Sequence, residues 1–87
     1  MKELQIIRLY NGLSSELARV KGEHKPTLVR EYANSLAKEK CEMLTSIFKF
    51  RNAWVNAITD ESAPTLPDNY QEWMEFLKAE TEALKNS

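Results

Sequence analysis

The chain has few of the residues with which small proteins build metal sites, cross-links or phosphate loops. Its 87 residues include one cysteine (Cys41), one histidine (His24) and two glycines. One cysteine cannot form a disulfide within the chain, and one cysteine with one histidine cannot complete a structural zinc site. Two glycines are too few for a glycine-rich phosphate loop. We therefore expect no metal and no other cofactor, so the fold must depend on well-packed helices or on self-association.

Long hydrophobic runs are also missing. No apolar stretch approaches the roughly 20 residues that cross a bilayer, and no targeting segment is visible. Together with the lone cysteine, this predicts a cytoplasmic protein without membrane contact. Because 87 residues are too few for two separate cores, we expect one helical domain over residues 1–87.

No pair of side chains suggests catalysis. Cys41 lies on the apolar side of a predicted helix beside Leu44 and Phe48, where a cysteine is more often a small core residue than a nucleophile. His24 falls in a predicted loop between charged neighbours, which is typical of a solvated histidine. The sequence therefore predicts neither an enzyme nor a small-molecule substrate.

Helical periodicity is what the sequence does contain. Apolar residues recur at steps of three and four along three segments, the spacing of one helical face. These segments are about 2–21, 26–58 and 69–85. Gly22 suits the left-handed position that ends a helix, and Pro26 suits the first turn of the next. No glycine or proline occurs between Pro26 and Pro64, so we expect a continuous central helix of roughly 50 Å. The predicted fold is an all-α, three-helix antiparallel bundle with a long central helix.

Two details of the helix ends and interiors stay open. Gly12 and the serines after it allow a break near residues 11–15 of the first helix. Asp68 has the chemistry of an N-cap for the last helix, and Gln71 three residues later would complete a capping box.

The lengths of the predicted helices leave one stretch with too few neighbours. The first helix would lie along the beginning of the central helix and the last along its end. The segment 41–58 is apolar on two stripes, so one neighbour would leave several hundred Å² of apolar surface exposed, which soluble monomers rarely do. We therefore predict a partner-binding surface of aromatic, aliphatic and arginine residues, the first and last of which are common hot-spot types. These residues are Phe48, Phe50, Arg51, Trp54 and Val55. The alternative is a compact bundle that buries the same residues, either because the first helix reaches further along the central helix or because the central helix bends near residues 38–42.

Charge divides along the chain. Residues 1–52 contain 10 Lys and Arg against 6 Asp and Glu, a net +4, whereas residues 53–87 contain 2 against 7, a net −5. The simplest interpretation is an acidic last helix packed against basic earlier ones. Its outer face is a second candidate surface, for a basic partner, with residues Glu72, Glu75, Glu80 and Glu82. A nucleic-acid surface would use the basic residues of the first two helices, Arg19, Lys21, Lys25, Arg30 and Lys38, although glutamates are interleaved with them.

The favoured function is that of a non-enzymatic protein–protein interaction module, which presents a helix face to another protein as a regulator, accessory factor or inhibitor. Small phage-encoded inhibitors are one class with these properties. Two alternatives stay open. One is a nucleic-acid-binding regulatory protein, and the other is a homodimeric assembly factor.

Overall fold

All the regular structure in the described residues of the computed structural model, 1–58 and 64–87, is α-helical. The predicted all-α class is confirmed. The helices are α1 (Lys2–Lys21), α2 (Leu28–Asn34), α3 (Lys38–Asn56) and α4 (Tyr70–Lys85). The predicted bounds of the first helix agree with α1, and those of the last helix agree with α4 to within one residue.

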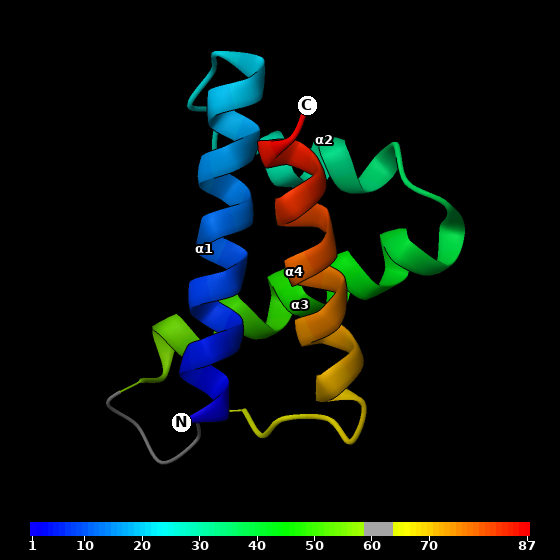
Figure 1. Cartoon of the computed structure of the whole chain (residues 1–87). Helices are drawn as coiled ribbons and strands as arrows, with labels where there is room; N and C mark the ends of the chain where they lie inside the picture. The colour runs from blue at the N-terminus through cyan, green and yellow to red at the C-terminus, as the bar shows by residue number, and fades with distance from the viewer. Residues whose placement is uncertain (59–63) are drawn as a thin grey trace.

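The first and last helices lie side by side and run in the same direction (Figure 1). At one end the Lys2 Nζ donates a hydrogen bond to the Tyr70 hydroxyl at 2.6 Å. At the other end the Arg19 guanidinium donates to the backbone oxygen of Leu84 at 3.1 Å. Since the two helix starts meet and the two helix ends meet, α1 and α4 are parallel. Parallel first and last helices are what an antiparallel three-helix bundle gives, but the sequence places these two helices along opposite ends of the central helix, whereas they pack against each other.

The middle of the chain forms a second layer. Gly22 adopts the left-handed conformation, with φ of 69°, and its N–H donates to the Ala18 oxygen at 2.8 Å, so α1 ends where the sequence predicts. Beyond this turn α2 runs away from α1, and α3 returns behind α1 and α4 (Figure 1). The helix α3 contacts each of the other three helices.

The predicted continuous helix over 26–58 is wrong, because the chain breaks between α2 and α3. The Ser35 hydroxyl donates to the Tyr32 oxygen at 2.7 Å, and the Leu36 N–H donates to the Ala33 oxygen at 3.1 Å. Short polar side chains such as Asn34 and Ser35 compete for backbone groups in this way and disfavour a helix interior. Leu36 also packs against the core, which favours the reversal. The break lies just before the region 38–42 where a bend was the alternative.

Two details of the helices also differ from expectation. The helix α1 continues through Gly12 without a break. The N-cap of α4 is Asn69 rather than Asp68, and no side chain caps it, so the predicted capping box with Gln71 does not form.

The core explains why no large aromatic patch is exposed on α3. The largest fully buried side chains in the described part of the chain are Ile6, Leu13, Leu17, Leu44, Ile47 and Leu77. The exposed fraction is only 7% for Phe50 and 9% for Trp54. The Phe50 ring packs edge-on against the Trp73 ring, with the ring centroids 5.8 Å apart. The expectation that Phe50 and Trp54 are exposed is therefore wrong. The reason is that α1, α2 and α4 all contact α3, where a single neighbour was assumed.

This burial predicts unequal costs for two neighbouring truncations on α3. Trp54→Ala should lower the free energy of unfolding by about 3–5 kcal/mol, because it removes a buried aromatic side chain. Val55→Ala, at a side chain that is 41% exposed, should change it by no more than about 0.5 kcal/mol. Urea denaturation of both variants measures the difference. Equal, small losses would place Trp54 on the surface and contradict the packing described here.

Candidate functional site

A groove of about 560 Å³ lies between α1, the connection from α1 to α2, the start of α2, and α3. One wall comes from α1, with Asn11, Ser14 and Ser15. The opposite wall comes from α3, with Arg51 and Asn52. His24 and Lys25 reach the groove from the α1–α2 connection, whose place beside α1 can be followed in Figure 1.

The floor of the groove is aromatic and aliphatic. The Tyr10 and Phe48 rings lie with centroids 6.3 Å apart at an interplanar angle of 55°. Leu28 and Val29 from α2 are buried next to them. The residue before Phe48, Ile47, has its side chain in the centre of the core. The Phe48 side chain points toward the edge of the same helix face and is therefore half-buried. A ligand would thus meet a largely apolar base with polar walls.

Arg51 has unused hydrogen-bonding capacity. Its Nη1 donates to the Asn52 Oδ1 at 3.3 Å, and its Nε is buried without a hydrogen-bond partner. Among the described residues no carboxylate lies within ion-pair distance of it. A guanidinium has five N–H donors arranged in a planar fork that matches carboxylate and phosphate oxygens. Arg51 therefore offers an anion-binding group at the wall of the groove.

A second guanidinium lies over the same floor. The central carbon of the Arg30 guanidinium is 5.2 Å from the centroid of the Phe48 ring, a cation–π arrangement. Arg30 also lines a smaller adjacent cavity of about 280 Å³, which shares Val29 and Phe48 with the groove. Burial raises the pKa of the Tyr10 hydroxyl, and the charges of Arg51 and Arg30 act against that rise. Both arginines are therefore close enough to Tyr10 to act on it electrostatically.

The lining of the groove is cationic without compensating acids. Lys25 and Arg51 carry positive charge there, and no aspartate or glutamate is among the described lining residues. Glu23 lies nearby, with its Oε2 3.6 Å from the Lys25 Nζ, but both side chains are well exposed and such pairs contribute little. The groove is therefore suited to an anionic ligand, although the chain as a whole has a net charge of −1.

The predicted partner-binding residues separate into three environments. Phe48 and Arg51 lie in the groove, Phe50 and Trp54 lie in the core, and Val55 lies exposed outside both. Cys41 is half-buried against the core and His24 is exposed in the connection after α1. Two of the five residues selected from the sequence, Phe48 and Arg51, thus line the groove.

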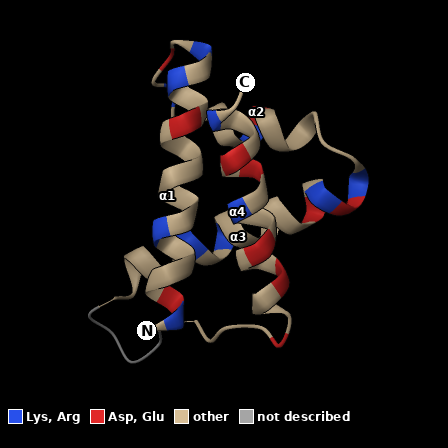
Figure 2. Ribbon diagram, viewed as in Figure 1, with Lys and Arg blue, Asp and Glu red and all other residues tan. Residues whose placement is uncertain are grey.

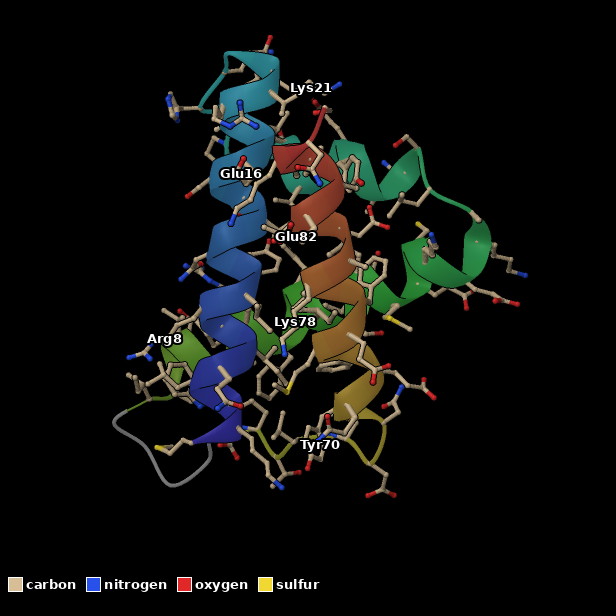
Figure 3. All side chains as sticks on the ribbon, viewed as in Figure 1. Arg8, Glu16, Lys21, Tyr70, Lys78 and Glu82 are labelled. Atoms are coloured by element: carbon tan, nitrogen blue, oxygen red, sulfur yellow. The ribbon has the colours of Figure 1, made fainter. Side chains whose placement is uncertain are left out.

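The predicted acidic face keeps three of its four members on the surface. Glu72, Glu75 and Glu82 are exposed on α4, and Figure 2 shows acidic residues in red along this helix. Figure 3 shows Glu82 on α4 and Glu16 on the neighbouring α1. Glu80 is half-buried instead, where it accepts a hydrogen bond from the Tyr32 hydroxyl and lies 3.6 Å from the Lys40 Nζ. Glu80 therefore links α4 to α2 and α3 and is not part of the outer face.

The predicted nucleic-acid residues do not share one surface. Arg19 is engaged by Glu16 at 2.8 Å and by α4. Lys21 lies at the end of α1 (Figure 3), and Lys38 begins α3 beyond the α2–α3 turn. Only Lys25 and Arg30 lie near the groove, on its rim and at the adjacent cavity.

The sequence does not predict several groove residues, namely Asn11, Ser14 and Ser15. Ser14 and Ser15 follow Gly12, a pattern that also favours a helix break near residues 11–15. Within the unbroken α1 they are short polar side chains that line the concave wall, and the Ser14 hydroxyl donates to the Tyr10 oxygen at 3.1 Å. A cluster of small polar residues beside an inward-facing tyrosine was the available signal.

Comparisons with known proteins give no relative: no family model, no curated protein and no solved structure matches the chain. Within residues 1–58 and 64–87 no three His, Cys, Asp or Glu side chains are grouped to hold a metal ion. No helix of that part of the chain combines the length and apolarity needed to span a membrane.

The Tyr32–Glu80 contact predicts a loss of stability at alkaline pH. Burial, followed by the hydrogen bond to Glu80 and its charge, raises the pKa of Tyr32 to about 12. In the unfolded chain a tyrosine has a pKa of about 10. The stabilisation is therefore complete below about pH 10 and is lost as the pH rises through about 12. The free energy of unfolding should fall more steeply over this interval in the wild-type protein than in Tyr32→Phe. Parallel pH profiles would contradict the assignment.

Proposed function

We propose that this protein is a non-enzymatic interaction module that receives an acidic segment of another protein in the groove between α1, α2 and α3. The observation that carries the proposal is the Arg51 guanidinium, which has no carboxylate partner among the described residues and lies beside the half-buried Phe48 ring. Arginine and aromatic residues are the side chains that most often dominate binding energy at protein interfaces.

The chemistry of the groove favours a polypeptide ligand that carries an acidic side chain next to an apolar one. An aspartate or glutamate of the partner would pair with the Arg51 fork. An adjacent apolar side chain would cover Phe48 and Leu28, which form part of the floor. Asn11 and Asn52 on opposite walls supply both donors and acceptors for a backbone. A cavity of about 560 Å³ fits a few residues, so the contact would be with a short segment and not with a whole helix.

The contacts of the candidate reactive groups are consistent with binding rather than catalysis. Ser14 donates its hydroxyl to a backbone oxygen, and the described residues place no hydrogen bond between it and His24. Cys41 is partly buried at the core and does not line the groove. A nucleophile needs a base within hydrogen-bond reach, and the described lining of the groove offers no such pair.

Sequestering an acidic segment would hide it from other partners, which is how a small regulator or inhibitor acts without chemistry. The exposed carboxylates of α4, such as Glu72 and Glu75, are an acidic surface of the chain itself. In the homodimer alternative, this acidic surface of a second copy occupies the groove. The oligomeric state, measured in the experiment below, distinguishes this alternative from the main proposal.

A displayed library of short random peptides, selected on the immobilised protein, tests the proposal. We expect enrichment of sequences with an acidic residue next to an apolar one. Addition of such a peptide to the ¹⁵N-labelled protein should shift the amide resonances of Tyr10, Phe48 and Arg51. Arg51→Met should weaken binding about tenfold or more, equivalent to about 1.4 kcal/mol, because it removes the fork and keeps the aliphatic stem.

Lys78→Met is the matched control, since Lys78 is an exposed cation on α4 away from the groove. It should leave the affinity unchanged at physiological salt. Shifts confined to α4 or to Val55 would contradict the proposal, and so would equal losses in the two variants. Concentration-dependent dimerisation that is abolished by Arg51→Met would favour the homodimer, and tight salt-sensitive binding of DNA or RNA in place of peptide would favour the nucleic-acid alternative.

A further inference from the structure

Two guanidiniums converge on one aromatic pair. Phe48 and Arg51 are three residues apart on α3 and so are neighbours on its surface. Arg30 comes from α2 and lines the smaller cavity, and its guanidinium lies 5.2 Å from the Phe48 ring centroid. The Phe48 ring in turn lies 6.3 Å from the Tyr10 ring. Two different helices thus bring like charges to the border between the groove and the smaller cavity.

Neither arginine is neutralised by the part of the chain that the structure describes. The ion pairs there involve Arg19, Lys25 and Lys40, and not Arg30 or Arg51. Arg51 is partly buried, which reduces the screening of its charge by solvent, whereas Arg30 is exposed. Both guanidiniums are available to an anion that binds beside the Phe48 ring.

The number of positive charges distinguishes between two kinds of acidic group. One carboxylate carries a single charge and is satisfied by one guanidinium fork, so it would leave the second arginine uncompensated. A phosphate monoester carries about −1.5 to −2 charges at pH 7 and has three strong acceptor oxygens. Lys25 on the rim supplies a third cation, and the Ser15 and Asn11 side chains supply neutral polar groups on the facing wall. The set of groups therefore matches a dianionic phosphate better than a carboxylate.

We infer that the acidic group received by the groove is a phosphate monoester on a serine, threonine or tyrosine side chain of the partner protein, held between Arg30 and Arg51. The inference rests on the proposed function, because it takes the ligand to be a segment of another protein. The apolar floor formed by Phe48, Leu28 and Val29 accommodates the residue next to the phosphorylated one. Phosphorylation of the partner would then switch its binding on.

Three peptide libraries that differ only at the central position, which is phosphoserine, glutamate or serine, test this inference. Binding to the full-length protein is measured by fluorescence anisotropy. The phosphoserine library should bind at least about tenfold more tightly than the glutamate library, and the serine library more weakly than both. Arg30→Met and Arg51→Met should each abolish the preference for phosphoserine. Arg8→Met, at an exposed arginine elsewhere on α1, should retain it.

The outcomes separate the inference from the proposed function. Equal binding of the phosphoserine and glutamate libraries would overturn the inference and leave the proposed function standing, whereas no binding of any library would overturn both. Inorganic phosphate and a nucleoside monophosphate form additional arms. If either binds as tightly as the phosphoserine library, the assignment to a protein partner is overturned. If both Arg30→Met and Arg51→Met still bind the phosphoserine library more tightly than the glutamate library, the placement of the phosphate between Arg30 and Arg51 is overturned.

Discussion

The parallel packing of α1 against α4 is the constraint on which the rest of the structure depends. Parallel neighbours require the intervening chain to travel back from the end of α1 to the start of α4, over a distance of about 30 Å for a 20-residue helix. The α2–α3 hairpin accomplishes this return and at the same time forms the second layer (Figure 1). The groove exists because α2 leaves α1 at Gly22 while α3 crosses behind it, so three elements diverge around Tyr10 and Phe48.

Local signals in the sequence were sufficient for α1 and α4 but not for the middle of the chain. Periodicity and Gly22 predicted the first helix and its end, because these are properties of one helix alone. The break after Asn34 is not predicted, because no glycine or proline, the residues that most often mark helix ends, lies there. There the Ser35 hydroxyl competes for a backbone oxygen and Leu36 packs against the core, and the second of these depends on tertiary contacts. The contact between α1 and α4 along their length also depends on that break, because a continuous central helix would hold them at its two ends.

The site was predicted only in part, for a related reason. The surplus of apolar residues on α3 was correctly noted, but its explanation required knowing that three helices surround α3. Phe50 and Trp54 accordingly belong to the core. Phe48 and Arg51 were included on the basis of residue type. Their association with Arg30 and with the polar wall of α1 is not visible in any local pattern, because it joins residues from three helices.

The central claim is that Arg51 is present for a ligand and not for the fold. A buried Nε without a hydrogen-bond partner opposes folding in the free protein. The most direct measurement is the free energy of unfolding of the unliganded protein with Arg51→Met, which retains the apolar stem. The account predicts stability equal to or up to about 1 kcal/mol above that of the wild type. A loss of more than about 1 kcal/mol, the size expected for a stabilising buried hydrogen bond, would show that Arg51 supports the fold and would contradict the claim.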